Sequence, residues 1–368
     1  MGKIYTALGL MSGTSMDGVD ASIVQSDGKS KYMSILDDYF EYPKSIFNNL
    51  TTLRDKIKSS NDLKKYQKQI KNIENEITIF HAKAVNDILA NNEMNVDFIG
   101  FHGQTIFHSA KEKITKQIGD GKLLSKLTKK KVVFNFRQND LKNDGEGAPL
   151  TPIFHQMLKK KFNIKQVSFF NIGGIINRTT IADNGLLTAK DMGPGMCLID
   201  KWIRTNSKQK YDKNGYLAKQ GKVNKKILEK YWSIFQSTDP ERKSYDVSDF
   251  DISFNKGMSL KDGAATLTVF TANIFISHFK NNSLFQDSKK EKIILCGGGR
   301  KNKFLVDTIK SWSKNLKLID EYGVDGDFVE SQAFAYIAIR SFLKLPISYP
   351  TTTGCRKPCS GGVLVKNY

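Results

Sequence analysis

Two glycine-bearing hairpins constrain the fold of this sequence most strongly, because each joins two apolar strands through a turn of small residues. The first, GLMSGTSMDGVDASIV, covers residues 9–24, and the second, VSFFNIGGIINRTTI, covers residues 167–181. After the first turn Val19, Ala21 and Ile23 alternate with polar residues, which is the period of a strand with one buried face. The two hairpins indicate an internal duplication, in which each hairpin opens one half of a two-lobed molecule.

The rest of the chain alternates between helical and strand patterns. Residues 61–91 carry apolar side chains at steps of three and four, which predicts a long amphipathic helix, and residues 329–343 predict another. Short apolar runs at 98–101, 132–136 and 292–299 predict strands. Because strands alternate with helices, we expect an α/β fold.

The chain is long enough for two domains, since 368 residues exceed what most single cores contain. Glycines and prolines punctuate residues 140–155, where a boundary is expected. We therefore expect an N-terminal lobe at residues 1–145 and a C-terminal lobe at 146–368. We leave open that the C-terminal helix crosses back to the first lobe.

Composition narrows the class of protein. No window of 18 residues is wholly apolar, and the most apolar stretch, residues 264–279, predicts a buried helix rather than a membrane span. Four cysteines and no signal peptide favour a reducing cytoplasm. The net charge of +20 could indicate a surface that binds nucleic acid. The basic residues are mainly scattered lysines, however, which favours an ordinary solvated surface. We expect neither a nucleic-acid nor a membrane partner, and a homodimer is left open.

Cys355 and Cys359 are four residues apart, but no second pair of cysteine or histidine residues lies near them in the sequence. Structural zinc sites use four ligands. The sequence therefore gives little support to a metal site there.

The first hairpin turn has the composition of an anion-binding loop. Gly13 and Gly18 permit backbone conformations in which successive N–H groups converge on one point. Thr14 and Ser15 add hydroxyl donors, and Asp17 could bind Mg²⁺. An ordinary turn rich in turn-forming residues is an equal alternative for this segment taken alone.

Two further loops favour a phosphate-rich ligand. Gly173 and Gly174 form the turn of the second hairpin, and residues 297–299 are three glycines between an apolar strand and a helix. Each loop is a weak signal by itself, but three of them follow apolar strands in one chain. The sequence has no P-loop motif, no protein-kinase catalytic loop and no dinucleotide-binding fingerprint.

Five polar residues are candidates for catalysis or substrate binding. Asp191 precedes a Gly-Pro-Gly bend, where it would be either a general base or a helix-capping residue. His102 and Gln104 are expected beyond the end of a strand, where they would bind a polar ligand or serve the structure. Arg137 suits a ligand carboxylate or a surface ion pair, and Glu330 opens the last long helix, where it would contact a ligand or match the helix dipole.

Ten motifs, in this order along the chain, resemble those of the bacterial anhydro-N-acetylmuramic acid kinase family. They are GLMSGTSMDGVD, FHGQT, QIGDG, EGAPLTPIFH, NIGGIIN, DMGPGMCLID, YDKNG, CGGGRKN, ESQAFAYIAIR and PTTTG. The resemblance implies the fold of the actin, sugar-kinase and heat-shock ATPase superfamily, with duplicated RNase H-like α/β cores and an interlobe cleft for ATP and Mg²⁺. It implies a kinase that opens the 1,6-anhydro bridge of 1,6-anhydro-N-acetylmuramic acid with water and phosphorylates O6. The product would be N-acetylmuramic acid 6-phosphate, in peptidoglycan recycling.

The resemblance assigns roles to two parts of the chain. Asp191 occupies the catalytic position, and residues 13–20 form the ATP segment. From their position alone, His102, Gln104, Arg137 and Glu330 are the expected sugar contacts. The residues expected at the nucleotide are Gly13, Thr14, Ser15, Met16, Asp17, Gly18, Val19, Asp20, Gly173, Gly174, Gly297, Gly298 and Gly299, with Asp17 as the metal ligand.

Two departures from the family pattern lie beside the expected base. Met192 and Met196 stand where relatives usually have a threonine and an asparagine, so two hydrogen-bonding groups are missing. These departures motivate an alternative, a catalytically weakened nucleotide-binding or regulatory protein of the same fold.

Overall fold

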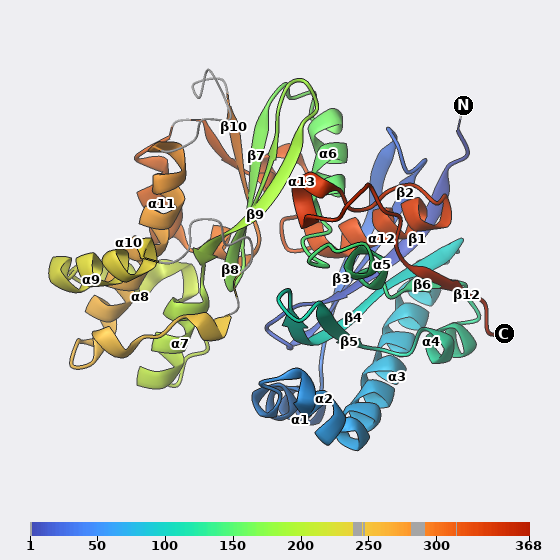
Figure 1. Ribbon diagram of the computed structural model, residues 1–368, viewed down its shortest axis with the longest axis horizontal. Helices are drawn as coiled ribbons and strands as arrows, with labels where there is room; N and C mark the ends of the chain where they lie inside the picture. Colours follow the sequence, from blue (N-terminus) through green and yellow to red (C-terminus); the bar gives the residue numbers. More distant parts are fainter. Residues whose placement is uncertain (1, 238–244, 246, 281–290, 314) are drawn as a thin grey trace. The chain divides into compact units, whose positions relative to one another are not determined.

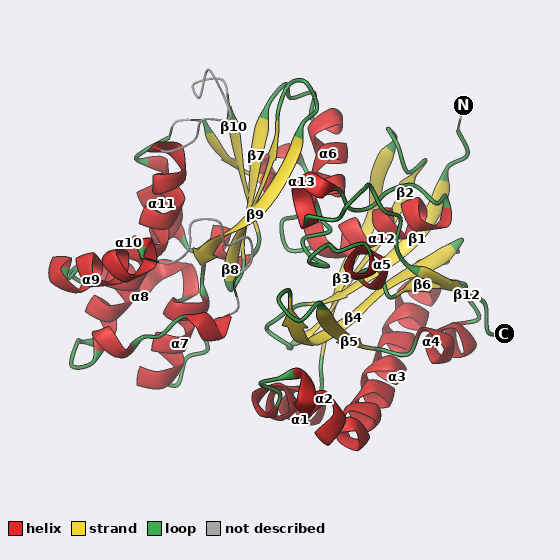
Figure 2. Ribbon diagram, viewed as in Figure 1, coloured by secondary structure: helices red, strands yellow, loops and turns green. Residues whose placement is uncertain are grey.

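The computed structural model describes residues 2–237, 245, 247–280, 291–313 and 315–368 (Figure 1). The chain divides into two compact units. Unit 1 contains residues 1–163 and 328–368, and unit 2 contains residues 164–327. Each unit has one sheet covered by helices (Figure 2).

The sheet of unit 1 is built around the first hairpin. Its strands are β1 (Tyr5–Ser12), β2 (Gly18–Ser26), β3 (Tyr32–Glu41), β4 (Phe98–Ser109), β5 (Ile114–Ile118), β6 (Val132–Phe134) and β12 (Val363–Val365). They lie in the order β12-β6-β4-β1-β2-β3, with β5 paired to β4. β1, β2 and β3 form an antiparallel meander, and β4 continues the sheet parallel to β1, followed by β6.

The sheet of unit 2 repeats this arrangement around the second hairpin. Its strands are β7 (Val167–Ile172), β8 (Ile175–Ile181), β9 (Leu187–Pro194), β10 (Lys292–Cys296) and β11 (Leu316–Leu318), in the order β11-β10-β7-β8-β9. Again the first three strands are antiparallel, and two parallel strands follow on the other side of the first. The two sheets confirm the expected α/β fold with duplicated RNase H-like cores. The cleft expected between the lobes stays a prediction.

The helices of unit 1 are α1 (Lys44–Lys56), α2 (Ser60–Lys65), α3 (Gln67–Asn91), α4 (Gly121–Thr128), α5 (Gln138–Lys142), α6 (Pro152–Lys161), α12 (Val329–Phe342) and α13 (Pro350–Thr353). The single helix predicted over residues 61–91 is therefore two helices. Tyr66, with φ −101° and ψ 17°, leaves the helical conformation between them, and Ser59 and Asp62 form a capping box that starts the first.

The helices of unit 2 are α7 (Cys197–Asn206), α8 (Tyr216–Gln220), α9 (Lys225–Gln236), α10 (Leu260–Lys280) and α11 (Lys303–Lys310). Helix α10 contains the apolar stretch that predicted a buried helix, and Ala264, Leu267 and Phe270 lie in the core of unit 2. No helix in the described part of the chain is long and apolar enough to span a membrane.

Helix α12 lies directly on the sheet of unit 1 because two paired strands carry glycine beneath it. Gly9 on β1 pairs with Gly100 on β4. A Cβ at Gly9 would lie 2.0 Å from the carbonyl oxygen of Ser331, and one at Gly100 would lie 2.4 Å from that of Phe334. The helix and sheet backbones therefore approach as closely as glycine allows.

The compact units differ from the expected division at residues 145 and 146. Helix α6 follows that point in the sequence, yet it packs against α12 and belongs to unit 1. The C-terminal helix also belongs to unit 1, since residues 328–368 return to it. Glycine and proline mark the loop at residues 143–151, between α5 and α6, but tertiary packing decides which unit the next helix joins.

We predict that Gly9→Ala lowers the free energy of unfolding by about 1–3 kcal/mol, because the added methyl group overlaps the backbone of α12. Urea unfolding followed by circular dichroism measures the change. Gly2→Ala is the control, since its Cβ would lie 3.8 Å from the nearest atom, Cβ of Asp27. Equal stabilities of the two variants would contradict the proposed role of close helix–sheet approach.

Candidate active site

The turn between β1 and β2 is held from beneath by buried side chains. Ser12 Oγ lies 2.6 Å from Gln104 Oε1 and 2.9 Å from the carbonyl oxygen of Gly18. Tyr42 donates its hydroxyl to Ser12 Oγ, and Gln104 Nε2 donates to the carbonyl oxygen of Gly13 at 3.0 Å. Both ends of the Gln104 amide therefore position the turn, and the sugar contact expected of Gln104 stays a prediction.

The crest of the same turn is open. Thr14 and Ser15 are exposed, and a Cβ on Gly13 would meet only Ser15 Oγ, at 3.8 Å. Ser15 also donates its hydroxyl to Asp17 Oδ1 at 2.6 Å, and the Asp17 side chain is exposed. The turn thus presents backbone N–H groups, hydroxyls and one carboxylate on a surface with room above it.

Three other residues of this loop point elsewhere. Met16 has φ 58° and is almost fully buried, and Val19 is fully buried, so both side chains belong to the core of unit 1. Asp20 is half-buried on β2, paired with Met11 of β1. Met16 and Val19 have only backbone groups to offer a ligand.

His102 and Gln104 lie within a strand rather than beyond its end. β4 extends from Phe98 to Ser109, because β5 pairs with its second half and continues the ladder past the short apolar run. A bulge between Thr105 and Phe107 marks this extension.

His102 and Arg137 form a hydrogen-bonded pair. Arg137 can only donate, so its Nη2, 2.9 Å away, donates to His102 Nε2, and His102 Nδ1 donates to the carbonyl oxygen of Gly103 at 2.8 Å. Burial first, and then the positive charge of Arg137, holds the pKa of His102 well below its ordinary value. His102 is therefore a neutral acceptor that fixes the guanidinium.

Glu330 completes this group electrostatically. It lies in the first turn of α12. Burial lowers the pKa of Arg137 to about 10, and the negative charge of Glu330 opposes part of that decrease. Arg137 Nη1 also donates to the carbonyl oxygen of Gly147 at 2.7 Å. All four residues expected at the sugar thus belong to unit 1, where Arg137 interacts with both His102 and Glu330.

In unit 2 the β7–β8 turn supports the Gly-Pro-Gly bend. The carbonyl oxygens of Gly173 and Gly174 accept from Met196 N at 2.8 Å and Gly195 N at 2.9 Å. A Cβ on Gly195 would lie 2.4 Å from the Gly173 oxygen, so only glycine permits this contact.

Asp191 lies near the end of β9, and donors hold both of its carboxylate oxygens. Asn177 on β8 is its cross-strand partner, and Asn177 Nδ2 donates to Oδ1. The backbone N–H of Tyr245 donates to Oδ2 at 2.9 Å. The helix after the bend, α7, has Met196 at its N-cap position, so Asp191 does not cap it.

Met192 and Met196, the two departures from the family pattern, face the core of unit 2, and Met192 does so at a bulge. Ile176 pairs with Gly193 and Asn177 with Asp191, so Met192 is the extra residue on β9. Met192 and Met196 both pack against the apolar core of unit 2. The methionines therefore leave the two hydrogen bonds to Asp191 in place.

The third glycine loop follows β10. A Cβ on Gly297 would lie 2.3 Å from Asn171 Oδ1, and one on Gly299 would lie 2.3 Å from Cγ2 of Ile172, so both pack against the end of β7. Gly298 has no atom within 4 Å of its Cβ position and faces open space. Unit 2 therefore brings the loop together with the end of the strand that leads into the Gly173 turn.

Sequence reasoning missed Asn177 and Tyr245 as partners of Asp191. Asn177 could have been found, because it ends the NIGGIIN motif and the hairpin register places it opposite the next strand. Tyr245 lies 54 residues from Asp191, and no local pattern connects the two.

The family profile and the curated relatives carry the same name and match nearly the whole chain. A family profile described as anhydro-N-acetylmuramic acid kinase matches residues 5–367. A protein named anhydro-N-acetylmuramic acid kinase from Pelagibacter ubique is 53% identical over 100% of both chains, and one from Agrobacterium fabrum is 37% identical over 100% of both. Among solved structures, component A of (R)-2-hydroxyglutaryl-CoA dehydratase from Acidaminococcus fermentans has a TM-score of 0.46 at 12% identity, over 92% of this chain and 100% of that one.

We predict that the free energy of unfolding of unit 1 decreases in mild acid, because unit 1 buries neutral histidines. Burial lowers the pKa of His81 to about 4 and that of His155 to about 3, and His102 behaves likewise. The unfolded chain protonates these residues near pH 6.5, so it binds more protons than the folded chain below that pH, and stability falls as the pH falls.

Between pH 7.5 and 5.5 we expect each histidine to remove about 1 kcal/mol from the free energy of unfolding of unit 1. Asp200, whose pKa burial raises to about 6, belongs to unit 2 and acts in the opposite direction there. Urea unfolding at the two pH values and constant salt measures the loss in unit 1, about 3 kcal/mol. Equal free energies at both pH values would show that the histidines titrate normally in the folded chain.

Proposed function

The chain belongs to the anhydro-N-acetylmuramic acid kinase family, and we propose that Asp191 is the catalytic base of its reaction. The observation that carries this proposal is the pair of hydrogen bonds, from Asn177 and from the Tyr245 N–H, that fixes both carboxylate oxygens. A base held in one orientation is ready to accept a proton from a water molecule within hydrogen-bond reach.

One base is enough for both steps of the proposed reaction. Asp191 takes a proton from water, the water oxygen bonds to the anomeric carbon, and the bond from that carbon to O6 breaks. O6 leaves with the electron pair and attacks the γ-phosphorus, so the ring opening and the phosphoryl transfer need no second base. Bound ATP supplies the phosphoryl group, and ADP and the 6-phosphate sugar are the products.

The glycine loops fit the phosphates of ATP. In unit 1 the crest of the turn, residues 13–15, is exposed and has open space at Gly13, as a phosphate cradle requires. In unit 2 Gly298 is open in the same way, while its neighbours pack against β7. We propose backbone contacts from these loops, including Gly18, Gly173 and Gly174, in which Met16, Val19 and Asp20 take part through the main chain.

Asp17 fits Mg²⁺ by its chemistry. It is an exposed carboxylate whose Oδ1 accepts from Ser15, and Mg²⁺ prefers oxygen ligands and usually retains several waters. Asp17 would hold the ion directly or through water, where its charge balances that of the phosphates.

The group formed by buried His102 and half-buried Arg137 and Glu330 suits recognition of the sugar. Arg137 is held by His102 and by the Gly147 carbonyl, and a guanidinium has five N–H donors, so donors remain for a substrate carboxylate. Because His102 is neutral, it does not compete with the guanidinium for that negative charge.

We do not favour the alternative of a weakened regulatory protein, because Asp191 is held by Asn177 and the Tyr245 N–H although Met192 and Met196 lie beside it. We place the reaction in the cytoplasm, where ATP is available and the four free thiols are compatible with reducing conditions. A nucleic-acid partner is not part of the proposal, and a homodimer stays open.

We predict that Asp191→Asn lowers kcat by about 10²–10⁴-fold, because an amide cannot accept the proton of water. The assay follows ADP and the 6-phosphate sugar with ATP, Mg²⁺ and 1,6-anhydro-N-acetylmuramic acid. Binding of ATP, measured by calorimetry, should change less than twofold.

Asp183→Asn is the matched control, since Asp183 is exposed in the β8–β9 turn, and its activity should equal that of the wild type. Asn177→Ala should give an intermediate loss, because Asp191 keeps the Tyr245 hydrogen bond. Full activity of Asp191→Asn would remove the proposed base, and ADP formation independent of the sugar would contradict the sugar-kinase reaction.

A further inference from the structure

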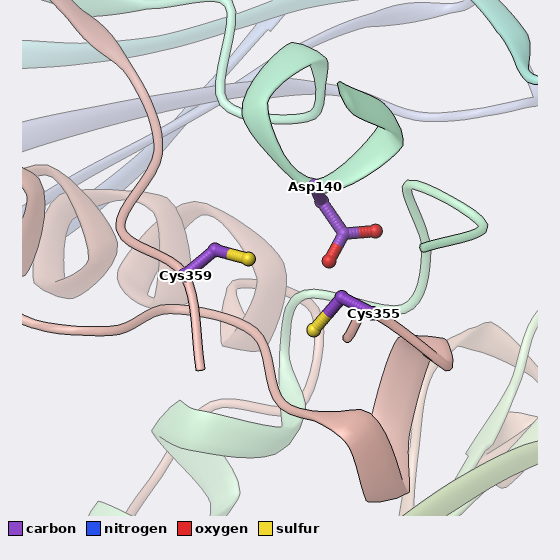
Figure 3. Close-up of side chains that lie close together, drawn as sticks. All are labelled: Asp140, Cys355 and Cys359. Atoms are coloured by element: carbon purple, nitrogen blue, oxygen red, sulfur yellow. The ribbon is translucent and has the colours of Figure 1, made fainter. Parts of the chain in front are cut away.

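A cluster of potential metal ligands lies in unit 1 among residues to which the proposed reaction gives no role. The carboxylate of Asp140 and the thiols of Cys355 and Cys359 converge, with one ligand atom from each residue within 4.8 Å of the others (Figure 3). All three residues are buried, with exposed fractions of 1%, 1% and 5%. The sequence separates Asp140 from the two cysteines by more than 200 residues, so only the fold supplies this third ligand.

The two cysteines share one loop that turns their sulfurs toward a common point. Cys355 follows the C-cap of α13, and Cys359 pairs with Ser348 through an isolated β-bridge. Both thiols contact the carbonyl oxygen of Lys357, at 3.2 Å from Cys355 Sγ and 3.0 Å from Cys359 Sγ. The loop therefore presents two sulfurs and one carbonyl oxygen together.

Asp140 is fixed on the other side by hydrogen bonds to its carboxylate. Thr353 Oγ1 donates to Oδ1 at 2.6 Å, and the N–H of Gly147 donates to Oδ2 at 2.7 Å. A Cβ on Gly145 would lie 2.1 Å from Oδ2, so the chain leaves room for the carboxylate by using glycine. Ligating carboxylates in metalloproteins are oriented by such outer hydrogen bonds.

Ser348 places a buried hydroxyl beside Cys359. The residue is 1% exposed, and its Oγ interacts with the Cys359 thiol. A metal-bound thiolate at Cys359 would accept a hydrogen bond from this hydroxyl, as outer hydrogen bonds commonly support metal ligands.

We propose that Asp140, Cys355 and Cys359 bind a thiophilic divalent cation of the Zn²⁺ class, with the Lys357 carbonyl or a water as fourth ligand. Ligand atoms around tetrahedral zinc lie about 3.3–3.8 Å apart, from bond lengths of about 2.0–2.3 Å, so small side-chain shifts close the site. Two thiolates, one carboxylate and a divalent ion carry one net negative charge. The guanidinium of Arg137, which interacts with Asp140, offsets it.

The site would join the C-terminal segment to helix α5. Asp140 lies on α5, whose N-cap position is Arg137, and the cysteines lie in the segment that leads to β12. The bound ion would therefore stabilise the part of unit 1 that carries Arg137, without touching the substrate.

The experiment titrates Co²⁺ into the full-length, reduced and metal-free protein, since Co²⁺ replaces Zn²⁺ and reports its ligands by absorption. We expect one equivalent to bind and to produce the near-ultraviolet charge-transfer band of cobalt–thiolate bonds, which Zn²⁺ then abolishes. Cys355→Ser and Cys359→Ser should each weaken the band by half or more. The melting temperature should rise with Zn²⁺ in the wild type and not in these variants.

Cys197→Ser is the matched control, because Cys197 is a free, buried cysteine of unit 2 far from these residues in the sequence, and this variant should bind Co²⁺ as the wild type does. Co²⁺ bound without a thiolate band, or a band unchanged in Cys355→Ser, would overturn the proposal. So would a reduced protein that binds no Co²⁺ and whose two C-terminal thiols instead form a disulfide in air.

Discussion

Close approach of backbone to backbone at glycine is the constraint on which both units depend. In unit 1 Gly9 and Gly100 let helix α12 lie on the sheet, and in unit 2 Gly195 lets the bend after β9 rest on the carbonyl of Gly173. A side chain at any of these positions would separate layers that pack at van der Waals distance. Gly13 and Gly298 also lack a side chain, and the space beside them is unfilled. Glycine therefore allows close packing at some positions and leaves room for a ligand at others.

The core strands of the two units have the same order, but they carry different polar side chains. In unit 1 the strand next to the first hairpin carries Gln104, which holds the turn, and His102, which holds Arg137. In unit 2 the hairpin carries Asn177, which orients Asp191 on the neighbouring strand. β4 of unit 1 corresponds to β10 of unit 2, and β8 and β9 correspond to β2 and β3. The two polar groups therefore occupy different positions of the duplicated framework.

Polar groups buried in these units depend on partners that are distant in the sequence. His102 is kept neutral by burial and by Arg137, and Asp140 is satisfied by Thr353 and Gly147. Because an unpaired buried polar group is costly, such networks fix the segments that carry them. The C-terminal segment is bound to unit 1 in this way, which is why the cysteines in it reach Asp140.

The sequence by itself determined the fold class, the duplicated hairpins, the family and the position of Asp191 before a bend, because strand alternation and glycine turns are local. It predicted residues 61–91 as one helix and ended the β4 strand too early, since pairing with β5 is not local. Only the tertiary structure decided that α6 joins unit 1, that Gln104 bonds to Gly13, that Tyr245 holds Asp191, and that Asp140 lies beside Cys355 and Cys359. Those contacts join residues far apart in the chain, and their energy comes from burial and hydrogen bonding that exist only once the chain has packed.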